Sequence, residues 1–282
     1  MNGPAADGDY YLRSLYSLDG QTAVVTGGTG VLGSAIAMAL AMAGAKVGVL
    51  GRRRDVAESR AAQIKKRGGE AMAIPADVLD RPSLIAARER VIREWGGLQV
   101  LVNAAGGNTK AATIAEGSDP FAMSEAAFRD VVDLNLTGTL LPSLVFGEAM
   151  VSSGGGAIVN ISSMSASRAL TRVAGYGAAK AGVESLTRSL AVELGQRFGD
   201  SIRVNAIAPG FFIGEQNRSL LLQEDGSFTR RGEAIIAQTP AKRFGAPEDL
   251  VGAVVWLCGP GARFVNGVVI PIDGGFSAFS GI

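Results

Sequence analysis

Short runs of apolar residues alternate along the chain with longer segments in which apolar residues recur every three or four positions. Short apolar runs between turn residues predict buried strands, and the periodic segments predict helices. Their alternation is typical of stacked βαβ units around a parallel sheet. The strands predicted in this way are residues 22–26, 46–50, 71–76, 100–103, 157–162, 203–207 and 268–272.

Helices are predicted between these strands, the first at 34–43, with small residues, and the second at 55–67, with many charges. We therefore predict one α/β domain over residues 18–282, a doubly wound parallel sheet flanked by helices. Residues 1–17 are predicted to form a terminal extension. Residues 211–239, after the sixth strand, are rich in polar side chains and are interpreted as a small excursion from the sheet, a candidate lid.

The composition excludes several kinds of chemistry. The 282 residues include no histidine and one cysteine, Cys258, so a Ser-His-Asp triad, a histidine-ligated metal, an intramolecular disulfide and a thiolate metal cage are all excluded. The 27 Lys and Arg nearly balance the 26 Asp and Glu, which gives no basic surface for nucleic acid. The longest weakly charged run, 35–50, is shorter than a membrane span, and the first residues do not resemble a signal peptide. We expect no metal, no nucleic acid, no membrane, and a soluble cytoplasmic protein.

The first predicted strand leads directly into the glycine-rich turn TGGTGVLG and then into a helix. Glycine lets the backbone turn tightly and approach a ligand, and the free N–H groups at a helix start bind phosphate. The strand–turn–helix context therefore predicts a dinucleotide site, the alternative being a glycine-rich turn without a ligand. The residues predicted to surround the phosphates are Gly27, Thr29, Gly30, Val31, Leu32 and Gly33.

Gly51, Arg52 and Arg53 stand at the end of the second predicted strand. A site that prefers NAD places an acidic residue near this point, where it binds the adenosine ribose hydroxyls. An arginine instead binds the 2′-phosphate of NADP through charge-assisted hydrogen bonds. We therefore favour NADP(H) over NAD(H), with Arg52 and Arg53 as contacts. The alternative is a solvated basic loop at the start of the next helix.

Tyr176 and Lys180 lie four residues apart at the start of a predicted helix, so the phenol and the ammonium share one helical face. A cation about 4 Å away favours the phenolate by roughly 1 to 4 kcal/mol. This predicts a tyrosine pKa below its usual value of about 10. Such a pair would transfer a proton without histidine, although the same spacing also occurs on ordinary helix surfaces.

Ser162 and Ser163 end the fifth predicted strand shortly before Tyr176, and with them the chain resembles the short-chain dehydrogenase/reductase family. The resemblance implies a Rossmann-type fold and an NAD(P)-dependent oxidoreductase that interconverts a carbonyl and a secondary alcohol. Its motifs follow the family's order over nearly the whole chain: residues 26–33, Asp77, Val78, 103–106, Asn135, Ser163, Tyr176, Lys180, Pro209 and Gly210.

The resemblance also implies roles for single residues. Tyr176 would be the general acid in reduction and the base in oxidation, while Lys180 would lower its pKa and bind the nicotinamide ribose. Ser163 would hydrogen-bond the substrate carbonyl, Asn135 would interrupt its helix and hold a water of the proton relay, and Ser162 would be structural. The further cofactor contacts implied are Asp77, Val78, Asn103, Ala104, Ala105, Gly106, Pro209, Gly210 and Phe212.

Two positions depart from the family pattern. The middle glycine of the phosphate turn is Val31 here, with Gly30 one place earlier, so we expect a different turn that keeps its backbone donors. Gly214 stands where the family usually has a threonine that bonds the nicotinamide carboxamide, and that contact is therefore in doubt.

Residues 27–33, 209–218, 239–245 and 270–277 resemble sugar-acid enzymes of the fructuronate reductase or D-mannonate oxidoreductase type. A sugar acid needs a cation for its carboxylate and many polar contacts. The candidates are Asn108, Arg168, Arg172 and Arg218, of which each arginine is alternatively a solvated surface charge.

Two other functions stay open. A 3-oxoacyl-carrier-protein reductase, or another carbonyl reductase of the family, would share the catalytic set. The carrier-protein enzyme would need a basic docking surface, of which the polar string 215–218 gives no sign. A dinucleotide-binding protein without catalysis is disfavoured by the intact Ser163, Tyr176 and Lys180. In the family, helices like those starting near residues 124 and 176 pair subunits, which implies a homo-oligomer, usually a tetramer.

Overall fold

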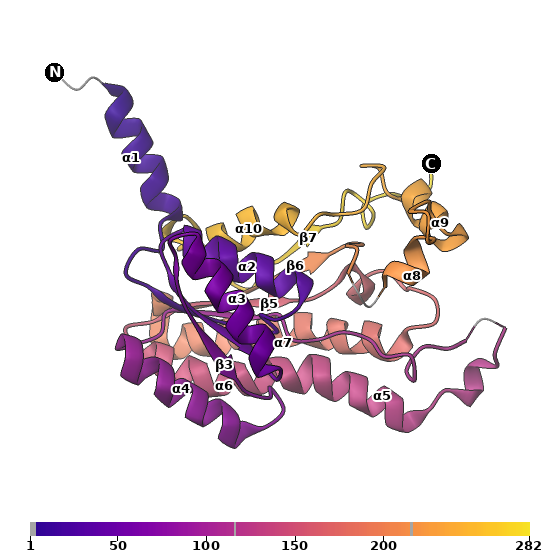
Figure 1. The fold of residues 1–282 in the computed structure, drawn as a ribbon, viewed down its shortest axis with the longest axis horizontal. Helices are drawn as coiled ribbons and strands as arrows, with labels where there is room; N and C mark the ends of the chain where they lie inside the picture. Colours follow the sequence, from indigo (N-terminus) through magenta and orange to yellow (C-terminus); the bar gives the residue numbers. More distant parts are fainter. Residues whose placement is uncertain (1–3, 116, 215–216) are drawn as a thin grey trace.

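Seven parallel strands form one sheet in the order β3-β2-β1-β4-β5-β6-β7, in a computed structural model that describes residues 4–115, 117–214 and 217–282 (Figure 1). The chain runs from β1 outward to β3, returns to β4 beside β1, and continues to β7. The direction of winding therefore reverses between β1 and β4, the point at which such sheets bind ligands. The strands are β1 (Thr22–Thr26), β2 (Lys46–Gly51), β3 (Glu70–Pro75), β4 (Val100–Asn103), β5 (Gly156–Ile161), β6 (Ile202–Pro209) and β7 (Val269–Ile272).

Helices cover both faces of the sheet, which confirms the doubly wound fold. The helices are α1 (Pro4–Tyr16), α2 (Val31–Met42), α3 (Arg54–Lys66), α4 (Arg81–Trp95), α5 (Glu125–Val132), α6 (Gly138–Ser152), α7 (Ala174–Phe198), α8 (Arg218–Leu221), α9 (Arg230–Gln238) and α10 (Glu248–Cys258). Buried side chains of α2, α3 and α10 form one hydrophobic core, and those of α4, α6 and α7 form the other.

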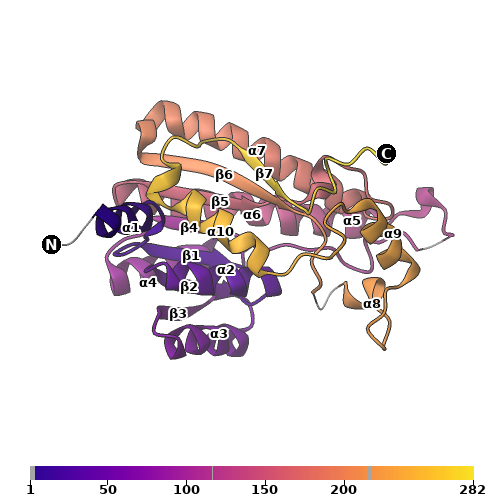
Figure 2. The same ribbon diagram turned by 90° about the horizontal axis from the view of Figure 1, so that it is seen from above.

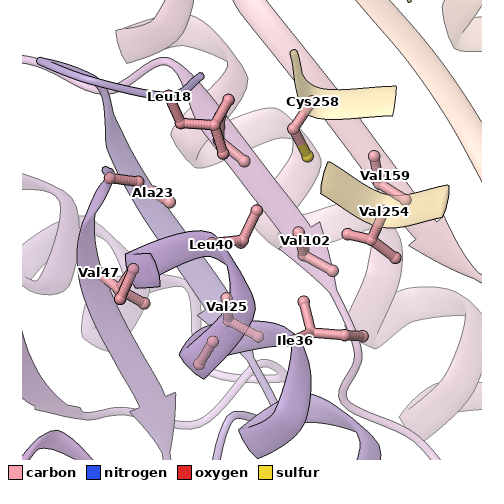
Figure 3. Close-up of a cluster of buried hydrophobic side chains, with 14 of the residues drawn as sticks. Leu18, Ala23, Val25, Ile36, Leu40, Val47, Val102, Val159, Val254 and Cys258 are labelled. Carbon is pink, nitrogen blue, oxygen red and sulfur yellow. The ribbon is translucent and has the colours of Figure 1, made fainter. Parts of the chain in front are cut away.

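The strand residues alternate between these two cores. Ala23 and Val25 of β1 pack toward α2 and α10, whereas Val24 packs toward the opposite layer. Figure 3 shows Val25 beside Ile36, with Val47 on the neighbouring strand, and all three belong to the first core. Because both faces are buried, the strands read in the sequence as continuous apolar runs.

The ends of the predicted strands and helices differ from the observed ends by at most two residues, except at the predicted helix 34–43, which corresponds to α2. Helix α2 begins at Val31 and not at 34, because Gly30 already occupies the cap position and Gly33 lies in the first turn. The glycines that mark the turn in the sequence therefore extend into the helix. The Val31 departure from the family pattern coincides with this helix start.

Two segments lie outside the layers. Helix α1, within the predicted extension, projects from the body, and the chain enters the core directly after it at the buried Leu18 (Figure 1). Helices α8 and α9, within the predicted excursion 211–239, lie with α5 at the opposite end of the molecule (Figure 2). Glu215 and Gln216, part of the sugar-acid resemblance, fall outside the described residues.

The continuous helical run Glu125–Ser152 is long and apolar enough to pass a test for a membrane-crossing helix, with a mean hydropathy of 1.2. Of its most apolar window, 56% is buried within the protein. A helix that covers a sheet passes the same test, and Phe146 and Met150 of this run are fully buried in the core.

Candidate active site

The turn after β1 is compact because its glycines approach other backbone atoms. Gly27 has φ +61°, and a Cβ there would lie 2.6 Å from the carbonyl oxygen of Ala104. A Cβ on Gly33 would overlap the carbonyl oxygen of Gly27. Gly30 precedes α2, and no side chain caps this helix, so the N–H groups of its first turn are available to an anion. The turn therefore fits the pyrophosphate of a dinucleotide.

The end of β2 contacts this turn. The N–H of Gly28 donates to the carbonyl oxygen of Leu50 over 3.0 Å. A Cβ on Gly51 would lie 2.7 Å from Cγ2 and 2.8 Å from Oγ1 of Thr29. Thr29 therefore fills the space that a side chain at position 51 would need. Arg52 and Arg53 follow, and both are exposed.

The residues after β4 form the wall beside the turn. Oγ1 of Thr26 accepts hydrogen bonds from the N–H groups of Ala104 (3.1 Å) and Ala105 (3.2 Å). Asn103 is buried and donates to Oγ of Ser143 and Oδ1 of Asn160, both over 2.9 Å. Asn103 thus supports the wall from inside the sheet.

Asp77 and Val78 lie just beyond β3. Oδ1 of Asp77 accepts a hydrogen bond from the N–H of Leu79 over 3.0 Å, which shapes the turn. Val78 is buried beside Gly138, where a Cβ would lie 3.0 Å from Cγ2 of Val78. These two residues therefore link the end of β3 to the start of α6.

Asn135 lies in a π-helical turn, Asp133–Thr137, between α5 and α6. The helix thus widens at Asn135 and continues, where the family resemblance implied an interruption. The Asn135 side chain accepts from the N–H of Gly107 over 3.0 Å and donates to the carbonyl oxygens of Gly107 and Val131, each over 2.8 Å. The wider π turn aims the amide at the loop after β4 and not along the helix.

Gly106 is exposed between two of the predicted catalytic residues. A Cβ on it would lie 2.5 Å from Oδ1 of Asn135 and 3.2 Å from Nζ of Lys180. Only a residue without a side chain leaves this place open. A flat ring such as a nicotinamide could approach the wall here, so the residues present fit a dinucleotide at both ends of the site.

Helix α7 brings Tyr176 and Lys180 to the end of β5, beside Ser163. Nζ of Lys180 lies 5.6 Å from the centre of the Tyr176 ring and donates to the carbonyl oxygen of Ile161 over 2.7 Å. Burial lowers the pKa of Lys180 to about 8. The structure therefore brings together the three residues on which the sequence prediction depended.

The pKa of Tyr176 differs from the prediction. Burial raises it above the ordinary value, and the hydrogen bond with the Ser163 side chain lowers it by less. The spacing in the sequence predicts that the charge of Lys180 dominates, whereas removal of the phenol from water is the larger effect in the folded chain. The phenol is therefore protonated at neutral pH.

The Ser162 side chain bonds to α7, in keeping with the structural role that was predicted for it. Its hydroxyl donates to Oε1 of Glu184 on α7 over 3.0 Å, and it is buried. Its contacts are those of a residue that holds β5 against α7.

The chain after β6 passes close to the phosphate turn. The N–H of Gly210 donates to the carbonyl oxygen of Ile272, 2.9 Å away, and a Cβ on Gly214 would lie 3.8 Å from Cγ2 of Val31. Pro209 ends β6 beside Ile272. The side chain of Phe212 is buried in the core, so Phe212 can contribute to a cofactor site only through its backbone.

The predicted substrate residues fall into two groups. Arg168 donates through Nε (2.8 Å) and Nη2 to the carbonyl oxygen of Ser277, and Arg172 donates through Nε to that of Ile114 over 2.6 Å. These two guanidinium groups therefore bind backbone at the rim of the site. Arg218 is exposed at the start of α8, and Asn108 lies in the loop after β4.

The sequence prediction missed the buried polar contacts behind the site. Asn160 donates to Oγ1 of Thr187 over 3.0 Å, which in turn donates to the carbonyl oxygen of Val183. Ser143 and Thr187 are two of several hydroxyl residues in α6 and α7, and nothing in the sequence sets them apart from the others. The sequence does not reveal which strand residue each one meets.

A cavity of about 190 Å³ lies near the ends of β6 and β7, lined by residues that include Phe211, Thr239, Arg243 and Asp273. Ser163, Tyr176 and Lys180 do not line it, so this cavity is separate from the catalytic group.

Comparison with known proteins places the chain among reductases. A family model described as Enoyl-(Acyl carrier protein) reductase matches residues 29–277. An oxidoreductase of Bacillus subtilis (strain 168), UxuB, whose function is uncharacterized, is 45% identical over 275 residues, which are 94% of this chain and 98% of that protein. The 7alpha-hydroxysteroid dehydrogenase of Escherichia coli (strain K12) is 33% identical over 258 residues, with 92% and 94% of the two chains covered.

Solved structures agree in fold. A Haemophilus influenzae protein described as a candidate D-mannonate oxidoreductase, with bound NAD, superposes with a TM-score of 0.88 at 37% identity and covers 96% of this chain and 100% of its own. A gluconate 5-dehydrogenase from Burkholderia cenocepacia J2315, in complex with NADP and tartrate, gives a TM-score of 0.85 at 28% identity, with 95% and 99% covered.

Proposed function

This chain belongs to the short-chain dehydrogenase/reductase family, and from that premise we propose that it reduces the ketone of a sugar acid with NADPH, or runs the reverse oxidation. The observation that carries the proposal is the meeting of Ser163, Tyr176 and Lys180 at the end of β5 beside Gly106. That arrangement supplies a hydrogen-bond donor, a proton donor and a cation next to an open wall.

When bound, a nicotinamide would supply the hydride for the carbonyl carbon. The hydroxyl of Ser163 donates a hydrogen bond to the substrate oxygen and orients it. Tyr176 gives its phenol proton to that oxygen, and the phenolate that results is stabilised by the nearby charge of Lys180. The raised pKa of Tyr176 suits the reductive direction, because the acid stays protonated at neutral pH.

Gly106 and the first turn of α2 would hold the cofactor, with Lys180 on the nicotinamide ribose. Asn135 holds the loop that carries Gly106, through both backbone groups of Gly107. The proton lost by Tyr176 is replaced from solvent, and the relay water assigned to Asn135 by family resemblance would serve this step.

We infer a preference for NADPH from the end of β2. Thr29 fills the space beside Gly51 where an NAD-type acid would stand, and the exposed Arg52 and Arg53 follow. An arginine there favours the 2′-phosphate. Arg52→Ala should raise the KM for NADPH about tenfold or more and leave that for NADH nearly unchanged. Equal effects on both cofactors would contradict the preference.

The sugar-acid substrate is supported by the fructuronate/mannonate type of local motifs and by the description of the Haemophilus protein. The test offers the enzyme a panel of keto-uronates, keto-gluconates, acyl thioesters and oxo-steroids. Reduction of each compound is monitored as the loss of NADPH or NADH absorbance. Reduction of the sugar acids above the others supports the proposal. Reduction of thioesters or steroids alone would replace it with the carrier-protein or steroid alternative.

The protein is further proposed to act as a homo-oligomer, a tetramer by family resemblance, in the cytoplasm. The helical run formed by α5 and α6, and helix α7, are the elements that would pair subunits.

A further inference from the structure

The loop after β4, residues 107–114, is held at both of its ends by paired hydrogen bonds. At Gly107 both backbone groups bond to the Asn135 side chain, over 3.0 and 2.8 Å. At Ile114 the N–H donates to the carbonyl oxygen of Arg172 over 3.0 Å, and the carbonyl accepts from Nε of Arg172 over 2.6 Å. Arg172 thus repeats at the far end of the loop what Asn135 does at the near end.

The loop between these two points is internally braced. Nδ2 of Asn108 donates to Oγ1 of Thr113 over 2.7 Å, and that hydroxyl donates to the carbonyl oxygen of Thr109 over 2.8 Å. The N–H of Thr113 also donates to the carbonyl oxygen of Lys110. A displacement of Ile114 would therefore move the whole segment and not only its end.

The braced loop contacts the proposed proton donor. Ala112 is buried in a small cluster with Ala127 and Val131 of α5, and the Tyr176 ring packs against this cluster. The loop therefore packs against one side of the Tyr176 ring, and the position of the loop depends on Arg172.

The backbone conformation of Arg172 is unusual at the point where Arg172 bonds to Ile114. Its φ is +74°, in the left-handed region that residues other than glycine and asparagine seldom adopt. Such conformations persist where surrounding contacts enforce them, and they concentrate near functional sites. Here the conformation occurs two residues before α7, the helix that carries Tyr176.

We propose that Arg172 is a positioning residue for Tyr176, acting through the loop 107–114, and not a ligand of the substrate carboxylate. The proposal rests on the proposed role of Tyr176 as the proton donor. A positioning role predicts slower proton transfer for every substrate, whereas a carboxylate ligand would affect only the binding of acids.

The test compares Arg172→Ala with the parent and with Arg129→Ala, a control that removes an exposed arginine from α5. Steady-state kinetics are measured with an acidic keto sugar and with an uncharged ketone. We expect kcat to fall about tenfold for both substrates, with KM within about threefold of the parent, while the control stays unchanged. Amide hydrogen exchange within 107–114 should become faster in Arg172→Ala alone.

A second variant guards against a general loss of folding. Arg172→Gly relieves the left-handed backbone but still lacks the Nε bond, so it should keep the thermal midpoint of the parent while showing the same kcat and exchange defects. A rise in KM confined to the acidic substrate, with parental kcat and exchange, would overturn the proposal. If the parent reduces no sugar acid, the proposed substrate fails, but kcat for the uncharged ketone, together with the exchange measurement, still decides the role of Arg172.

Discussion

The chemistry of the site depends on two side chains, the partly buried Tyr176 and the buried Lys180, whose pKa values shift in opposite directions. Tyr176 keeps its proton because burial disfavours the phenolate, and Lys180 gives up its proton more readily because burial disfavours the ammonium. The sequence showed that the two would be neighbours but did not show how deeply they would be buried. The spacing therefore predicted that Tyr176 and Lys180 would be neighbours, but it did not predict the direction in which the pKa of Tyr176 shifts.

Replacement of the phenol tests the proposed proton donor directly. Tyr176→Phe keeps the ring that packs against Ala112 and removes only the hydroxyl. Turnover should fall by about 10²- to 10⁴-fold, while cofactor binding, measured by fluorescence titration, stays within a few-fold of the parent. Tyr16→Phe, on the projecting helix α1, is the matched control. A Tyr176→Phe enzyme as active as the parent would mean that the proton comes from another group.

The buried lysine should also affect stability in a pH-dependent way. Because the folded pKa of Lys180, about 8, lies below the ordinary 10.5, the unfolded chain binds more protons between these values, and stability rises with pH in that window. The raised pKa of Tyr176 acts in the opposite sense, but only as the pH rises above about 10. The measurement therefore lies between pH 7 and pH 10.

The free energy of unfolding in urea, parent minus Lys180→Met, should rise by about 2 kcal/mol from pH 7 to pH 10. Other lysines contribute equally to both proteins and cancel in the difference. A difference that is flat with pH would show that Lys180 titrates in the folded chain as it does in water.

At the scale of elements, the strands and their parallel arrangement were predictable because both faces of the sheet are buried and each strand reads as an apolar run. The start of α2 was not, because Gly30 and Gly33 read as a turn while the helix already begins at Val31. The contacts of Arg168 and Arg172 were also unpredictable. Each one binds a carbonyl oxygen far away in the sequence, and spacing alone contains no information on such a partner.

At Gly106 the loop after β4 meets Asn135 and Lys180, and the proposed nicotinamide would lie against this wall. Gly106→Ala should displace Asn135 or Lys180, since the new Cβ would lie 2.5 Å from Oδ1 of one and 3.2 Å from Nζ of the other. We expect NADPH affinity and kcat each to fall about tenfold or more. Gly252→Ala, on α10 with no atom near the added Cβ, should leave both unchanged. Parental kinetics in Gly106→Ala would show that the nicotinamide does not lie against this wall.

At the scale of the whole molecule, the layer formed by α4, α6 and α7 retains hydrophobic side chains that the monomer does not cover. Leu144 on α6 is 44% exposed and Val192 on α7 is 57% exposed. A second copy of the chain packed on this layer would cover them and would explain why the run Glu125–Ser152 is more apolar than one buried face requires.

Multi-angle light scattering should then give a mass of several chains for the parent and a smaller mass for Val192→Glu. Met42→Glu changes a similarly exposed side chain on α2, in the opposite layer, and should keep the parental mass. A parent with the mass of one chain would contradict the assembly. If Val192→Glu retained the full mass, the interface would have to lie on another face.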